Sequence, residues 1–78
     1  MKVAKTVKRR SWIGAAPERC ELCTAKISTV FFDAVVPGGG GWANMCPSCH
    51  RSRGCSTGTG FGQMYARGED GRFWKTEG

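Results

Sequence analysis

Two C-x-x-C pairs are the residues in this sequence whose spacing points most directly to a chemistry. Cys20 and Cys23 form the first pair and Cys46 and Cys49 the second, with 22 residues between the pairs. A C-x-x-C turn directs two thiolates at one point, so two such turns supply the four sulfur ligands that tetrahedral zinc prefers. We therefore predict one zinc ion held by these four cysteines. Four protein ligands leave the ion no open position, so its predicted role is structural rather than catalytic.

Other uses of these cysteines and of their neighbours are weaker interpretations. The pairs could be redox-active dithiols, but the βαβ pattern that should surround a thioredoxin-like motif is missing from the sequence. His50 follows Cys49 directly and could replace one cysteine as a ligand, although four well-spaced thiols favour a surface position for it. Cys55 lies outside both pairs, and we expect it to be a small, buried or half-buried side chain.

The composition also calls for a metal. The chain has 78 residues, twelve of them glycine, which is room for one domain with a marginal core. Domains of this size usually need a metal, disulfides or a partner, and five cysteines are an odd number that fits disulfides poorly. Residues 1–10 hold no apolar signal-peptide core, and no segment is long enough to span a membrane. We therefore expect a cytoplasmic protein, in a reducing compartment where thiolates are free to bind metal.

Positive charge is unevenly distributed along the chain. The formal net charge is +6, and no acidic residue precedes Glu18. Basic clusters attract phosphate backbones through counterion release, although a solvated tail is an equally good interpretation of such a segment. The residues that we predict to contact nucleic acid are Lys2, Lys5, Lys8, Arg9, Arg10, Arg51 and Arg53.

The elements that must position the cysteines read mostly as strands and loops. Residues 25–36 are rich in β-branched and aromatic side chains and predict a strand, which Pro37 and four glycines then end. Residues 42–45 lead back to the second cysteine pair. Residues 50–56 have room for one turn of helix that stops at Gly54, and residues 58–62 form a flexible loop. Residues 63–67 and 72–76 predict a hairpin around a turn that ends in Asp-Gly.

The predicted fold class is a small zinc-stabilised β-rich domain, a zinc ribbon with short β-hairpins and a disordered basic N-terminal arm. We assign residues 1–16 to the basic flexible arm and residues 17–78 to the zinc-ribbon domain. Trp12 and Ile13 are expected to mark the point where the arm docks on the body. Most aromatic side chains should form the core, because aliphatic residues are few, and we expect Phe61 or Trp74 to remain exposed. The aromatic candidates for stacking on bases are Trp42, Phe61, Tyr65, Phe73 and Trp74.

Two stretches resemble known families. The segment from Trp42 to Cys49, followed by Gly58 to Tyr65, resembles small zinc-ribbon-like proteins encoded by bacteriophages and prophages, and with the first cysteine pair the resemblance covers residues 20–65. It implies a viral accessory protein in the host cytoplasm and carries no agreed activity. The segment from Asn44 to His50 also resembles the end of an HNH nuclease motif, in which an asparagine, a C-x-x-C pair and a histidine close a ββα-metal fold.

The nuclease resemblance lacks the residues that would do the chemistry. Such nucleases need an Asp-His or His-His pair upstream, yet no histidine lies between Cys23 and Cys46, and Asp33 is the one carboxylate there. A single carboxylate without a general base is a poor hydrolytic site. We therefore predict that the protein is not an enzyme, with a degenerate HNH-like nuclease as the weakest alternative.

The leading functional hypothesis is an accessory protein that binds DNA or RNA through its basic clusters. The alternative is a protein-binding module that docks on a host machine such as RNA polymerase or the ribosome. The segment from Gly58 to Gly62 lacks the strand-helix context and the lysine of a nucleotide-binding loop, so no small-molecule substrate is predicted. Salt separates the two hypotheses, because affinity for nucleic acid falls steeply with ionic strength.

Overall fold

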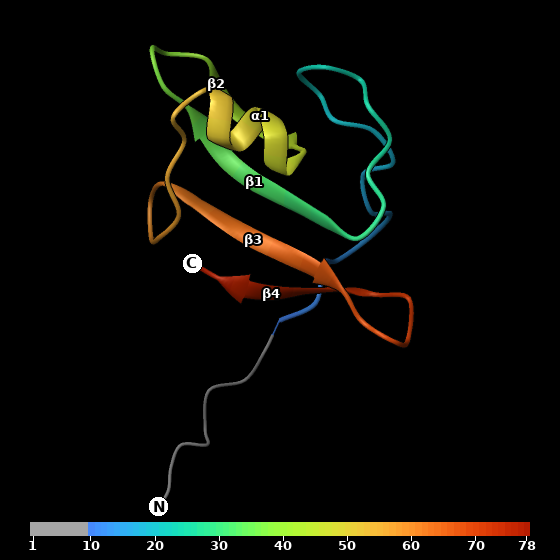
Figure 1. The fold of residues 1–78 in the computed structure, drawn as a ribbon. Helices are drawn as coiled ribbons and strands as arrows, with labels where there is room; N and C mark the ends of the chain where they lie inside the picture. Colours follow the sequence, from blue (N-terminus) through green and yellow to red (C-terminus); the bar gives the residue numbers. More distant parts are fainter. Residues whose placement is uncertain (1–9) are drawn as a thin grey trace, which may run out of the picture.

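The computed structural model describes residues 10–78, which fold around one antiparallel sheet (Figure 1). The strands are β1 (Val30–Val36), β2 (Gly41–Met45), β3 (Gly62–Arg67) and β4 (Phe73–Glu77), and they lie in the order β2-β1-β3-β4. One short helix, α1 (Pro47–Ser52), follows β2 and packs against β1. The predicted small β-rich domain is confirmed. No helix within residues 10–78 has the length and apolar character needed to cross a membrane.

The central strand β1 divides the core into two clusters, because successive side chains point to opposite faces of a sheet. Phe32 stacks on His50 of α1, so Phe32, Ala34 and Val36 face the helix, whereas Phe31 faces the other side. The helix-side cluster contains Cys20, Ala34, Val36, Ala43, Met45 and Cys49. The cluster on the opposite face, called the aromatic cluster below, contains Ile27, Phe31, Tyr65 and Phe73, with Trp12 and Ala16 packed against it.

Residues 10–12 extend the sheet beyond β4. The Trp12 amide donates to the Phe73 carbonyl at 2.8 Å, and the Lys75 amide donates to the Arg10 carbonyl at 2.7 Å. The Trp12 ring lies edge-on to Phe31 and Tyr65, with 5.2 Å between centroids in both pairs. The expected docking through Trp12 is confirmed, whereas Ile13 is 92% exposed. The predictions for Lys2, Lys5, Lys8 and Arg9, and for residues 1–9 of the flexible arm predicted over residues 1–16, lie outside the described part of the chain.

Two predicted elements begin elsewhere in the structure. The strand predicted from residue 25 begins at Val30, because the Ile27 amide donates to the Glu18 carbonyl at 2.9 Å and the Ile27 side chain is buried in the aromatic cluster. The helix predicted over residues 50–56 instead spans residues 47–52 and begins inside the second C-x-x-C pair. Gly54, with φ +70°, follows the end of this helix. The loop at residues 58–62 is closed by a 2.7 Å hydrogen bond from the Gly58 amide to the Gly62 carbonyl.

The predicted hairpin of β3 and β4 is confirmed, and its turn is held by one carboxylate. Asp70 Oδ1 accepts hydrogen bonds from the Arg72 amide at 2.9 Å and from Trp74 Nε1 at 3.2 Å. Gly71, with φ +83°, supplies the left-handed backbone conformation at the end of the turn. Trp74 is half-buried beside this turn, so of the two aromatics expected to remain exposed only Phe61, at 60%, does so.

Replacing Asp70 with Asn should lower the melting temperature by the same amount at about pH 7 and about pH 5.5. The hydrogen bond from the Arg72 amide, followed by that from Trp74, lowers the pKa of Asp70 below its ordinary value. An Asp whose pKa is lower in the folded than in the unfolded state contributes its full stabilisation at pH values above the unfolded-state pKa. This contribution to the free energy of unfolding is lost only as the pH falls through the folded-state pKa. Thermal melts of both proteins at the two pH values measure this. A difference that shrinks at the lower pH would contradict the assignment.

Candidate metal centre

The first cysteine pair lies in a tight turn whose backbone amides point at one sulfur. The amides of Leu22 and Cys23 lie 3.4 and 3.5 Å from Cys20 Sγ. The Thr24 amide donates to the Cys20 carbonyl at 2.9 Å, and the Cys20 amide donates to the Ala25 carbonyl at 2.8 Å. The two bonds to carbonyl oxygens close the turn. The two amides that point at the sulfur favour a thiolate at Cys20, because a backbone N–H group donates more strongly to an anion.

The second pair is formed where β2 ends and α1 begins. Cys46 is the N-cap of the helix, with an extended backbone, and its sulfur lies 3.5 Å from the Cys49 amide. Pro47 occupies the first helical position, where its missing N–H group costs no hydrogen bond. The helix therefore presents Cys46 and Cys49 on one side, one turn apart.

Two hydrogen bonds fasten the first turn to β2 and bring the pairs together. The Glu21 amide donates to the Asn44 carbonyl at 2.9 Å, and the Asn44 amide donates to Glu21 Oε1 at 2.8 Å. All four sulfur atoms lie within 4.8 Å of one another, and Cys23 Sγ lies 3.7 Å from Cys46 Sγ. Four sulfurs at about 2.3 Å from a tetrahedral ion would be about 3.8 Å apart, so the cluster fits a bound metal.

The four thiols differ in exposure, and the pKa values of Cys20 and Cys49 are shifted in opposite directions. Cys20 and Cys49 are buried, Cys46 is half-buried and Cys23 is exposed. Burial, followed by hydrogen bonds that the Cys49 thiol donates to the neighbouring sulfurs, raises the pKa of Cys49 to about 12. Burial also acts upward at Cys20, but hydrogen bonds from the amides of Cys46, Cys23 and Leu22 outweigh it and lower the pKa of Cys20 to about 6. Metal ligation needs thiolates, so a metal bound at these sulfurs would have to displace the proton of Cys49.

His50 and Cys55 lie outside the sulfur cluster. The imidazole of His50 stacks on Phe32 at 3.8 Å between centroids, and its Nε2 lies 3.3 Å from the Ser56 carbonyl. Cys55 is half-buried, as expected, with its sulfur 3.6 Å from the sulfur of Met45. Within residues 10–78, the four cysteines are the one group of three or more His, Cys, Asp or Glu side chains gathered closely enough to share an ion.

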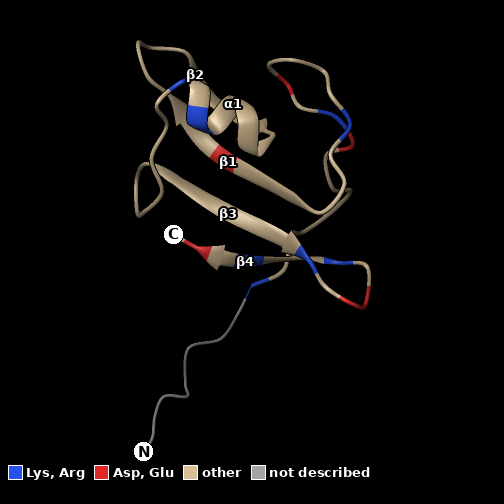
Figure 2. Ribbon diagram, in the orientation of Figure 1, with Lys and Arg blue, Asp and Glu red and all other residues tan. Residues whose placement is uncertain are grey.

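The basic residues predicted to contact nucleic acid are not brought together in the described part of the chain. Arg51 lies on α1 and Arg53 caps its C-terminal end, and both are exposed. Arg10 is exposed beside β4, which is at the opposite edge of the sheet from β2. Figure 2 shows basic positions on α1 and, separately, around β4 and the neighbouring loops.

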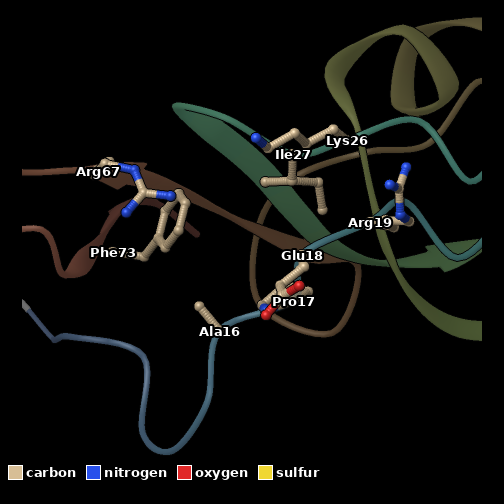
Figure 3. A pocket seen from close by; sticks show the side chains of 8 residues that line it. All are labelled: Ala16, Pro17, Glu18, Arg19, Lys26, Ile27, Arg67 and Phe73. Carbon is tan, nitrogen blue, oxygen red and sulfur yellow. The ribbon is translucent and has the colours of Figure 1, made fainter.

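A hollow of about 480 Å³ gathers three other cations that the sequence did not single out. Arg19, Lys26 and Arg67 lie around it, and Ile27 and Phe73 supply apolar lining (Figure 3). The residues lining this basic hollow, as it is called below, are Ala16, Pro17, Glu18, Arg19, Lys26, Ile27, Arg67 and Phe73.

Two arginines of the basic hollow are held in place by backbone carbonyls. Arg67 donates to the carbonyls of Ser28 and Gly71 at 2.8 and 3.1 Å, and its guanidinium lies 4.5 Å from the centre of the Phe73 ring. Arg19 donates to the Thr24 carbonyl at 3.1 Å. These hydrogen bonds fix the positions of the two guanidinium groups at the hollow.

Comparisons of the chain with protein-family models, with curated proteins and with solved structures find no match.

Proposed function

We propose that the cysteine cluster holds one zinc ion with a structural role. The support is the donor set: four sulfurs gathered within 4.8 Å, on two turns that come from separate parts of the chain. Zinc would join the turn at Cys20 to the junction of β2 and α1, and with four protein ligands it would have no open position for catalysis. His50, packed on Phe32, and Asp33, on the other face of β1, have no catalytic role in this proposal.

We further propose that this zinc domain is a nucleic-acid-binding accessory protein, in line with its resemblance to phage and prophage proteins. The observation that carries the proposal is the basic hollow. Arg19, Lys26 and Arg67 oppose one carboxylate, Glu18, so the lining carries an excess of positive charge. Guanidinium groups form paired hydrogen bonds with phosphate, and the volume of the hollow lies within the range of ligand pockets. The net charge of +6 would attract a polyanion from a distance.

Replacing Lys26 with Gln should weaken nucleic-acid binding and reduce its salt dependence. Each phosphate contact that is lost lowers the slope of log affinity against log salt by about 1. Fluorescence anisotropy with the metal-loaded chain and labelled DNA and RNA oligonucleotides, at several salt concentrations, measures both quantities. Arg51→Gln is the comparison variant, because it removes one exposed positive charge, itself a predicted contact, from α1 and leaves the hollow intact.

The possible results distinguish binding of nucleic acid at the basic hollow from attraction by the overall positive charge of the chain. Equal losses in Lys26→Gln and Arg51→Gln would show that the hollow has no special role in binding, because Arg51 lies outside it. The absence of binding to any oligonucleotide at low salt would contradict the proposed function. Binding to a protein that persists at high salt would favour the docking alternative, which the exposed side chains of Ile13, Trp42 and Phe61 also fit.

A further inference from the structure

One face of the sheet ends in a row of apolar side chains, two of which are exposed aromatics. Val35 of β1 pairs with Trp42 of β2, and on its other side the Val35 amide donates to the Phe61 carbonyl at 2.9 Å. Because Gly62 pairs with Ala34, Phe61 continues the register opposite Val35. Neighbouring strands are about 4.8 Å apart, so Trp42 and Phe61 flank Val35 at positions about 10 Å apart.

This row, Trp42-Val35-Phe61, lies on the face opposite α1. Val35 has the same parity along β1 as Phe31, whose ring belongs to the aromatic cluster, and the opposite parity to Phe32, which contacts α1. Trp42 is 54% exposed and Phe61 is 60% exposed, whereas Val35 is half-buried. Two large rings therefore remain accessible on this face of the sheet.

Polar side chains form the next row of the same face. The register places Asn44 and Gln63 on either side of Asp33, and all three are half-buried. Gln63 Oε1 accepts a hydrogen bond from the Tyr65 hydroxyl at 3.1 Å, which orients its amide nitrogen as a donor. Beyond this row, Trp12 covers Phe31 and Tyr65, so the accessible part of the face consists of the aromatic row and the polar row.

We propose that this face binds single-stranded nucleic acid, with one base stacking on Trp42, another stacking on Phe61, and base edges contacting Asn44, Asp33 and Gln63. The inference rests on the proposed function and names the form of nucleic acid that the domain takes. Stacking on aromatic rings accepts any base and needs bases that are not already enclosed in a duplex.

The charges around the face favour an unpaired strand over a duplex. The Asp33 carboxylate repels phosphates but accepts hydrogen bonds from the amino groups of bases, so it favours base edges rather than a backbone at the polar row. Cations lie farther along the same face: Lys75 pairs with Tyr65, and the basic hollow borders Ile27 and Phe73 of the aromatic cluster. Bases would occupy the end of the face that carries Asp33, and phosphates would follow the strand toward the cations.

The test compares binding of the metal-loaded full chain to a labelled single-stranded oligonucleotide and to the same sequence as a duplex. We expect tighter binding of the single strand. Trp42→Ala and Phe61→Ala should each weaken single-strand binding about fivefold to more than 100-fold, the range measured when a stacking side chain is removed. The salt slope should be unchanged, because neither variant removes a phosphate contact. Trp42→Phe should retain most of the affinity, since it keeps an aromatic ring.

The matched control is Ile13→Ala, which truncates an exposed apolar side chain next to Trp12, whose amide bonds to Phe73 of β4 and not to the strands of this row. Circular dichroism and metal content confirm that each variant is folded. Equal affinity for duplex and single strand, with no loss of affinity in Trp42→Ala or Phe61→Ala, overturns this inference. In that case, weaker nucleic-acid binding by Lys26→Gln would still support the proposed function. If no nucleic acid binds and Trp42→Ala abolishes a dimer seen in sedimentation, the row is an interface between copies and both proposals are wrong.

Discussion

Replacing Cys23 with Ser is expected to leave the chain unfolded at neutral pH. The helix-side cluster depends on the turn at Cys20 and the turn at Cys46 meeting, and one ion with four sulfur ligands would hold them together. Structural zinc contributes about 10–16 kcal/mol in small zinc-finger peptides, as much as the whole stability of an ordinary domain, about 5–15 kcal/mol. Circular dichroism and elemental analysis of the purified variant, together with wild-type protein treated with a strong chelator, measure the effect.

Cys55→Ser is the matched control for this result. It makes the same chemical change in a half-buried thiol that contacts Met45 and lies outside the cluster. We expect it to retain one metal ion per chain and a cooperative melt. Metal loss in Cys55→Ser would show that a ligand has been assigned wrongly. A fold that survives complete removal of metal would show that the cluster does not hold the domain together.

Replacing Phe31 with Ala is expected to cost about 3–5 kcal/mol of stability, as truncation of a buried aromatic usually does. Phe31 is fully buried, stacks on Tyr65 at 5.2 Å and meets Phe73 edge-on at 4.9 Å. The cavity would also remove the surface on which Trp12 docks. Thermal and urea denaturation of the metal-loaded protein measure the loss.

Metal content separates this effect from that of Cys23→Ser. Phe31 points away from the face that carries the cysteines, so folded Phe31→Ala should still bind one metal ion. Ile13→Ala serves as the stability control, because a side chain that is 92% exposed buries little area. A loss below about 1 kcal/mol in Phe31→Ala would contradict the assignment of the aromatic cluster as a second core.

The features that could be predicted from the sequence are those that depend on short spacings. A C-x-x-C pair fixes the geometry of two sulfurs locally, and the turn ending in Asp70 and Gly71 specifies the hairpin of β3 and β4. The long segment between the pairs correctly predicted a strand and its return. The helix was misplaced because its start depends on Cys46 acting as N-cap, which follows only once that residue is seen to end β2.

The features that could not be predicted depend on register and on contacts between distant segments. Trp42 was one of five candidate aromatics, and its exposure follows from pairing with Val35 on the face that α1 leaves open. The basic hollow combines Arg19 and Lys26 of a loop with Arg67 at the end of β3. No spacing in the sequence links these residues, since they meet only when hydrogen bonds from Arg67 join the end of β3 to residues 28 and 29.

The two cores differ in when their residues leave the ribosome. All members of the helix-side cluster lie between Cys20 and Cys49, so the metal-binding half can assemble while the rest of the chain is still being made. The aromatic cluster cannot form until Phe73 has been synthesised, and its contacts with Trp12 and Phe31 close a long loop of the chain. We therefore expect a nascent chain stalled before β4 to hold metal already, with the surface of Phe31 still open to chaperones.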